Sequence, residues 1–240
     1  MAFYRGPNIV TDGLVLALDA ASPRSYPGSG TTWYDLSGNN YSASLNNGAA
    51  FNTGTQGITF DGTNDHATFD NDETIRYTPT DSFTLSAVFS LVDIQEYQDN
   101  LYPTGTTLFG KGSTAGSVGL GLRRETNGQL RIYAGSRGVS QITEAYNIEA
   151  NRIYSTTFTY TPTLQKLYVN GELQSSSDTS GGAGGSFDNT GWRIFYPGAV
   201  PGGNSKYGEG TVFLARVYSR ELTTLEILQN YNATKSRFGL

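Results

Sequence analysis

Alternating apolar and polar positions recur along this chain and predict β-strands. In residues 82–91, SFTLSAVFSL, the apolar positions all fall on one side of an extended chain: Phe83, Leu85, Ala87, Phe89 and Leu91. A period of two is typical of a strand with one buried face. Residues 154–160 repeat this alternation and end before Pro162, and 164–169 return as a second apolar run, so we predict that these segments pair. Residues 14–18, LVLAL, predict another buried strand.

Two Asn-Gly pairs lie between alternating runs and predict β-hairpins. They are Asn127-Gly128 and Asn170-Gly171. A two-residue hairpin turn needs positive φ at both central positions, which Asn and Gly adopt most readily. The longer glycine-rich segments 175–191 and 196–210 lack periodicity, and we expect surface loops there.

The chain ends on a segment with a helical pattern, at residues 223–233. Thr223 and Glu226 have the spacing of a capping box, and Leu222 and Ile227 have that of a hydrophobic staple. The expected packing face consists of Leu225, Leu228 and Tyr231. So short a helix has little stability of its own, so we expect it to lie against a larger β structure.

Composition favours one β-rich domain over residues 1–240. The chain has 30 glycines, no cysteine, 16 basic and 21 acidic residues and a net charge of −5. No basic stripe is present for nucleic acid or anionic lipid, so neither nucleic acid nor a membrane is an expected partner. Many short strands with one helix predict an all-β fold, a two-sheet antiparallel sandwich of the jelly-roll kind.

Four motifs carry a family resemblance that spans most of the chain: WYDLSGNN (33–40), ITFDGTNDHATF (58–69), KLYVNGEL (166–173) and ARVYSRELTTLEILQNYNA (215–233). Their order and spacing resemble the concanavalin A-like, laminin-G-like jelly-roll family. In that family the last core strand is followed by a Tyr-x-Arg-x-Leu motif and a short helix across the sandwich edge. Tyr218, Arg220 and Leu222 match this motif, so the resemblance implies the same position for the terminal helix.

The opening segment 8–38, NIVTDGLVLALDAASPRSYPGSGTTWYDLSG, and the closing segment 231–240, YNATKSRFGL, resemble versions of this domain in tailed bacteriophages. This resemblance implies an accessory protein of the virion, made in the host cytoplasm and exposed as a capsid decoration or head-fibre component. The alternative is a carbohydrate-binding receptor-recognition module of a tail fibre or secreted adhesin. The expected partners are other virion proteins or a host surface glycan, and a homo-oligomer, most simply a trimer, would multiply weak contacts.

Candidate catalytic groups are few. Glycoside hydrolases that resemble this family carry a Glu-x-Asp-x-x-Glu signature, and no stretch of the chain has it; Glu144 and Glu149 have the wrong spacing. The single histidine, His66, has no cysteine and no second histidine to pair with, and we expect it to be exposed at the end of a turn. The sequence therefore predicts a protein that is not an enzyme.

Carboxylates in two turns are candidate calcium ligands: Asp61, Asp65, Asp70 and Asp72. Calcium prefers such oxygen ligands. Related domains that bind calcium often carry an acidic pair before the final strand, where this chain has residues 212–214, VFL. We therefore expect Asx turns at these aspartates and no cofactor, with a calcium site as the alternative.

Loop aromatics with polar neighbours are candidates for stacking on a sugar: Tyr26, Trp33, Tyr196 and Tyr207, with Tyr34 beside them. Trp33 lies in the family's turn motif, where packing is the favoured role. For Tyr196 and Tyr207 a sugar site and a structural role are equally supported, and either ring would also suit a protein interface.

The N-terminal residues 1–12 are a candidate docking arm. Phe3 and Tyr4 would be its apolar anchors, and Pro7 limits regular structure. The alternative is an ordinary edge strand of the same domain.

Overall fold

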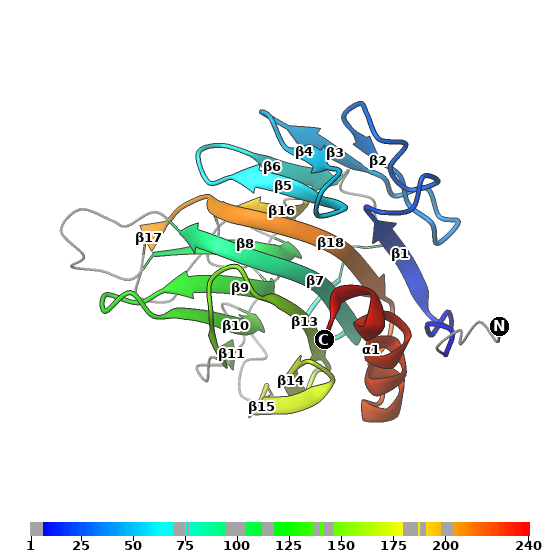
Figure 1. Ribbon diagram of the computed structural model, residues 1–240. Coiled ribbons are helices and arrows are strands. Elements are labelled where there is room, and N and C mark those ends of the chain that lie inside the picture. The colour runs from blue at the N-terminus through cyan, green and yellow to red at the C-terminus, as the bar shows by residue number, and fades with distance from the viewer. Residues whose placement is uncertain are drawn as a thin grey trace.

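Strands make up most of the computed structural model, which describes residues 7–69, 75, 77–94, 104–111, 118–136, 140–141, 146–179, 187, 191–197 and 204–240. They form two sheets that face each other, and the helix α1 (Thr224–Phe238) lies against one of them (Figure 1). The predicted all-β sandwich with a C-terminal helix is confirmed. In the described part of the chain, no helix is long and apolar enough to cross a membrane.

The eight-stranded sheet has the order β15-β14-β13-β7-β18-β5-β4, and β1 also pairs with β18. Its strands are β1 (Leu14–Asp19), β4 (Ala50–Asn52), β5 (Gly57–Asp61), β7 (Phe83–Ile94), β13 (Ile153–Tyr160), β14 (Leu164–Val169), β15 (Glu172–Asp178) and β18 (Gly208–Tyr218). All of these pairs are antiparallel, and the long strand β18 runs through the middle of the sheet. The predicted buried strand at residues 14–18 and the pairing of 154–160 with 164–169 are confirmed.

The ten-stranded sheet has the order β11-β10-β9-β8-β16-β6-β3-β2, with β12 beside β10 and β17 beside β8. Its strands are β2 (Thr32–Trp33), β3 (Ala43–Asn46), β6 (His66–Phe69), β8 (Thr104–Lys111), β9 (Val118–Arg124), β10 (Leu130–Ser136), β11 (Ser140–Gln141), β12 (Tyr146–Ile148), β16 (Trp192–Tyr196) and β17 (Asn204–Ser205). The short pair β17–β8 is parallel, and the other pairs of this sheet are antiparallel.

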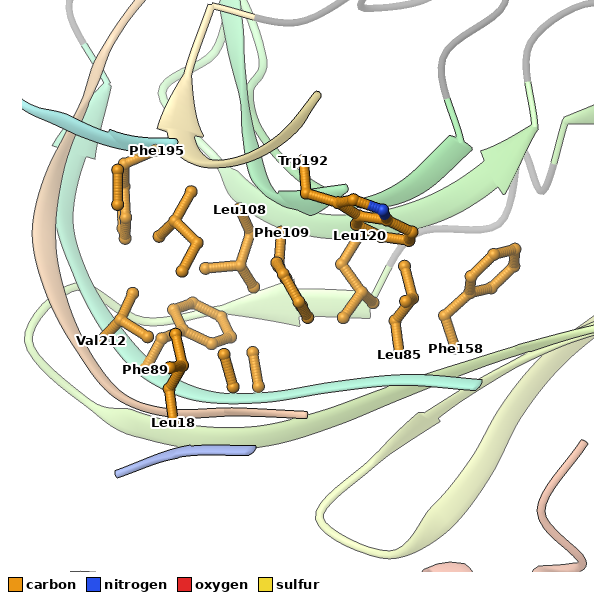
Figure 2. Packing of buried hydrophobic residues seen from close by; sticks show 14 of the residues in the cluster. Leu18, Leu85, Phe89, Leu108, Phe109, Leu120, Phe158, Trp192, Phe195 and Val212 are labelled. Carbon is orange, nitrogen blue, oxygen red and sulfur yellow. The ribbon is translucent and has the colours of Figure 1, made fainter. Parts of the chain in front are cut away.

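The main core fills the space between the two sheets (Figure 2). Aromatic and aliphatic side chains from both inner faces meet there, among them Leu18, Phe89, Phe109, Phe158 and Trp192. Burial of such rings removes a large apolar area from water, and this is the main term that stabilises a sandwich.

Strand β7 departs from the prediction of one buried face. Thr84, Ser86 and Val88 lie on its outer face and are buried as well. The outer face is covered because α1 packs on this side of the sheet, where Phe238 contacts the small cluster of Val88, Phe213 and Leu214. The polar positions of the alternation therefore mark a second, covered layer and not a solvated surface.

The two Asn-Gly pairs form different turns. Asn170 and Gly171 both have positive φ, 52° and 81°, and join β14 to β15 as the predicted two-residue turn. At the other pair only Gly128 has positive φ, and the amide of Glu125 donates to the carbonyl of Gln129 at 2.9 Å. That hairpin is confirmed, but its connection is one residue longer than predicted.

Helix α1 begins with the predicted capping box of Thr223 and Glu226, and it continues to Phe238, five residues beyond the prediction. Gly239 ends it in the left-handed conformation, with φ 67°. The predicted packing face is wrong at two of its three positions: Leu225 and Leu228 are 77% and 40% exposed, whereas Ile227 is 3% exposed. The third predicted residue, Tyr231, is half-buried and packs against Gly171. Ile227 packs with Leu222, as the staple predicted, in a cluster that also contains Tyr218.

The segment before β1 is bound to the terminal helix. The amide of Val10 donates to Asn230 Oδ1 at 2.8 Å, and the carbonyl of Val10 accepts from the Tyr218 hydroxyl at 3.1 Å. Gln229 Nε2 donates to the carbonyl of Asn8 at 2.7 Å. Residues 7–12 of the candidate docking arm therefore contact their own domain without forming a strand, while Phe3 and Tyr4 lie outside the described residues.

Candidate functional site

Two of the four aromatic residues expected to bind sugar are buried in the fold. Trp33 has no exposed surface and belongs to the main core. Tyr26 is also buried; its hydroxyl donates to the carbonyl of Gly30 at 2.7 Å, and its ring stacks on Phe51 with 5.5 Å between centroids. Neither ring has a face free for a ligand, so neither residue belongs to a sugar site. The packing role favoured for Trp33 is confirmed, and the sugar-binding assignment of Tyr26 is wrong.

The candidate metal ligands that the structure describes are occupied as turn formers. Asp61 Oδ1 accepts a hydrogen bond of 2.8 Å from the amide of Thr63, and this bond lowers the pKa of Asp61. Asp65 is buried and accepts from the amide of Asp61 at 3.1 Å, while desolvation raises the pKa of Asp65. Among the residues described, no three His, Cys, Asp or Glu side chains are grouped to hold a metal ion. Asp70 and Asp72 lie outside the described residues.

Tyr196 and Tyr207 meet at the surface with His66 and Arg193, and we name this group the His66 cluster. The His66 ring lies 5.0 Å from the Tyr196 ring and 5.9 Å from the Tyr207 ring, and the two tyrosine rings are 5.8 Å apart. The Arg193 guanidinium lies over the Tyr196 ring, 4.0 Å from its centroid. All four side chains are half-buried. His66 is thus the first residue of β6 and is half-buried between two rings, whereas the sequence predicted an exposed residue at the end of a turn.

Strand register brings the cluster together. Arg193 of β16 stands opposite Thr68 of β6, next to the pair formed by Ile194 and Ala67. Ile194 and Ala67 point into the core, so Arg193 and Thr68 face outward, and His66 shares that face because it is two residues from Thr68. Asn46 of β3 stands opposite His66. This outer face therefore joins rings with hydroxyl and amide groups.

Tyr196 faces outward because the strand is irregular at Phe195. Phe195 has a φ of 50°, which is rare for a residue with a large side chain and costs on the order of 1–2 kcal/mol. Ile194 and Phe195 are consecutive and both lie in the core, so the next side chain, Tyr196, changes sides. The bend in the backbone at Phe195 therefore places the Tyr196 ring beside His66.

Packing of the Phe195 ring holds this bend in place. The ring stacks on Phe60 at 5.0 Å between centroids. It also occupies the space that a Cβ atom would need at Gly208 and Gly210, with distances of 2.5 and 3.0 Å to ring atoms. These two glycines follow Tyr207, so the same packing fixes both ends of the His66 cluster.

The polar atoms of the cluster leave specific groups available to a ligand. His66 Nδ1 lies 2.9 Å from the carbonyl of Asn64, which can only accept, so Nδ1 is the donor and Nε2 faces no partner within the described residues. The Arg193 guanidinium forms no ion pair with any residue that the structure describes. Burial raises the pKa of the Tyr207 hydroxyl, so this group remains a neutral donor and acceptor.

A second surface feature is an open depression of about 470 Å³ between the end of β7 and the β9–β10 turn. Asp93 and Arg124 form an ion pair of 2.8 Å in it, and Asn127 and Gln129 add amide groups. The described residues that line it include no aromatic ring. It lacks the flat apolar surface that sugar binding uses, so the His66 cluster is the better candidate.

The sequence comparison assigns the family. The model of the concanavalin A-like lectin/glucanases superfamily matches residues 61–228, which include His66, Arg193, Tyr196 and Tyr207. The chain belongs to this superfamily. This result confirms the predicted jelly-roll family, while the narrower phage resemblance is not tested by it. No curated protein matches the chain in sequence.

Solved structures share the superfamily fold. Trypanosoma rangeli sialidase in complex with sialic acid has a TM-score of 0.62 at 20% identity, over 93% of this chain and 33% of that one. The binding domain of botulinum neurotoxin serotype D has a TM-score of 0.62 at 16% identity, over 92% and 51%. The binding domain of Paraclostridial Mosquitocidal Protein 1 has a TM-score of 0.63 at 17% identity, over 93% and 52%.

These matches correct the prediction that the protein is not an enzyme. The present chain spans about a third of the length of the sialidase chains, and the same architecture is therefore part of proteins that are enzymes. The absence of one hydrolytic signature excluded one mechanism only, and it gave no ground for excluding catalysis. At these identities the likeness shows the fold alone.

Arg193 and His66 are the members of the cluster that sequence reasoning missed. Arg193 carried a usable signal, because it alternates with the apolar residues Trp192 and Ile194 and so had to face outward. His66 alternates in the same way with Ala67 and Phe69. The sequence pattern did not show that the strands of these two residues, β6 and β16, are neighbours in the sheet.

Proposed function

We propose that this protein is a carbohydrate-binding module and that the His66 cluster is its sugar-binding surface. The observation that carries the proposal is the meeting of Tyr196, Tyr207 and His66 on one outward face. Flat rings can stack on the apolar face of a sugar ring, while groups at their edges bind its hydroxyls. The membership in a superfamily of lectins and glucanases and the fold shared with two toxin binding domains support it.

The polar groups beside the rings fit this use. Asn46 and Thr68 border the cluster on the same face, and Asn46 Nδ2 donates to Thr68 Oγ1 at 3.1 Å. Amide and hydroxyl groups can each both donate and accept, as sugar hydroxyls do. The strained Phe195 backbone holds the Tyr196 ring before any ligand arrives, so binding loses little side-chain entropy.

The test is a glycan array followed by titration calorimetry on the best ligand, with the purified protein and single variants. We expect Tyr196→Ala or Tyr207→Ala to weaken binding by roughly tenfold, as loss of one aromatic contact of ~1.4 kcal/mol would do. Tyr34→Ala is the matched control, because Tyr34 is 47% exposed and belongs to a different segment. Equal affinities of all three variants would refute the site, and no binding to any glycan would refute the function.

We further propose that the module is exposed on a tailed-phage particle, as a capsid decoration or fibre component. The support is that the two segments with the phage resemblance, at the start and the end of the chain, form one unit. Both carboxylate oxygens of Asp19 in the opening segment accept hydrogen bonds of 2.8 Å from Arg237 in the closing segment. Immunogold labelling of intact particles tests the location, and light scattering tests the proposed trimer.

A further inference from the structure

Arg193 has a buried nitrogen without a hydrogen-bond partner. Its guanidinium lies in the His66 cluster, on the outer face of the ten-stranded sheet, and the Nη1 atom is shielded from solvent and bonded to none of the residues that the structure describes. Arginine remains protonated in a folded protein, so a full positive charge is held at this position. A buried polar group without a partner is unfavourable, so a ligand that supplies the partner gains binding free energy here.

The Tyr196 ring holds the Arg193 guanidinium without using its donors. The central carbon of the guanidinium lies 4.0 Å from the centroid of the ring. This contact is made with the π-face of the ring and takes up no N–H group, so the donors remain available to an acceptor. Burial raises the pKa of the Tyr207 hydroxyl, and the positive charge of Arg193 partly offsets this rise, so the charge acts on the neighbouring hydroxyl as well.

The row of residues across the sheet at Arg193 contains no acidic side chain. Register places Thr68 of β6 opposite Arg193 on one side and Gly110 of β8 opposite it on the other. The row continues to Ser44 of β3 and to Gly119 of β9. Hydroxyl groups and glycines therefore surround Arg193 on these strands, and none of them can neutralise its charge.

Two acids near the cluster in sequence are directed to other positions. Asp65, which precedes His66, is buried, and its Oδ2 accepts from the amide of Asp61 at 3.1 Å. Glu209 stands opposite Asp61, in the pairing of β18 with β5 in the other sheet. Neither forms an ion pair with Arg193. Within the described part of the chain, the positive charge in the cluster is therefore not paired.

The unpaired guanidinium indicates the class of sugar that the cluster takes. A guanidinium is a planar fork of N–H groups that can bind two oxygens of one carboxylate or sulfate group in parallel. We propose that the ligand of the His66 cluster is an acidic sugar, whose carboxylate or sulfate group pairs with Arg193. This inference rests on the proposed function and adds the charge of the ligand to it. The Tyr207 hydroxyl and His66 Nε2 remain for the hydroxyl groups of the same sugar.

Paired glycans test the role of charge with the natural protein. On an array, each carboxylate-bearing glycan is compared with its methyl ester and each sulfated glycan with its unsulfated form, and the best pair is then titrated by calorimetry. We expect the acid to bind roughly 10–100-fold more tightly, as hydrogen bonds to a charged group would provide. The two kinds of pair distinguish a carboxylate from a sulfate ligand. Equal affinities within every pair would overturn this inference and leave the proposed function intact, whereas binding to no glycan would refute both.

Arg193→Gln separates recognition of charge from support of the Tyr196 ring. In this variant the acid and its neutral counterpart should bind with similar affinities. Arg24→Gln is the matched control, because it removes an exposed arginine and should keep the preference for the acid. If Arg193→Gln weakened both members of the pair by the same factor, Arg193 would only support the ring, and the inference would be overturned. Should this variant not fold, the paired glycans with the natural protein still decide.

Discussion

Replacing Ile227 by Ala tests which face of α1 docks on the sandwich. Ile227 is 3% exposed and packs with Tyr168, Tyr218 and Leu222 in the cluster beneath the first helical turns. Truncation of a buried Ile to Ala costs ~2–5 kcal/mol, because transfer energy is lost and a cavity remains. For a chain of this length the melting temperature should fall by roughly 4–20 °C.

Leu225→Ala is the matched control, because it removes a similar side chain from the same helix. Leu225 is 77% exposed, and Ala has the highest helix propensity, so the free energy of unfolding should change by less than about 0.5 kcal/mol. Calorimetry of both variants at pH 7 measures the difference. If Leu225→Ala were as destabilising as Ile227→Ala, the observed helical phase would be refuted and the hydrophobic stripe of the sequence would be the docking face.

Three further predictions concern the start of α1, close packing and metals. The hydrogen bond from Arg220 lowers the pKa of Glu226 to about 2. The ionised Glu226 carboxylate therefore stabilises the protein fully above about pH 4.5, and this contribution disappears as the pH falls towards 2. Melting curves at different pH should show this loss in the natural protein and a smaller loss in Glu226→Gln. Gly121→Ala should cost ~1–3 kcal/mol in chemical unfolding because its Cβ would overlap the Tyr133 ring, and a Tyr133→Ala background should remove most of this cost. Chelator treatment should leave the melting temperature unchanged, and a fall of several degrees would show that a metal ion stabilises the turns at Asp61 and Asp65.

Local rules explain the parts of the fold that the sequence determined. The alternation in residues 83–91 predicts a strand because successive side chains point to opposite faces. Asn170-Gly171 predicts a tight turn because both residues tolerate positive φ, and Thr223 with Glu226 predicts a helix start because each satisfies the other's backbone amide. Each rule involves residues a few positions apart, so the chain pattern contains all the information required.

The face on which α1 docks depended on the tertiary structure. The buried positions, Ile227 and Asn230, include a polar residue whose amide is satisfied by Val10 and Tyr218 from distant segments. The hydrophobic pattern of the sequence predicted Leu225 and Leu228 as buried positions instead. The pattern does not show the long-range hydrogen bonds that make a buried Asn230 favourable.

The candidate site also depended on long-range packing. Tyr196 and Tyr207 were recognisable as candidates, and the turn motif favoured packing for Trp33, but Tyr26 was excluded only by its burial in the structure. His66 and Tyr196 meet because β6 and β16 are neighbours in one sheet and because Phe195 bends its strand around Gly208 and Gly210. Strand order and register are decided by which inner faces pack together best over the whole sandwich, so the sequence determined the elements and the tertiary structure determined which side chains they bring to one surface.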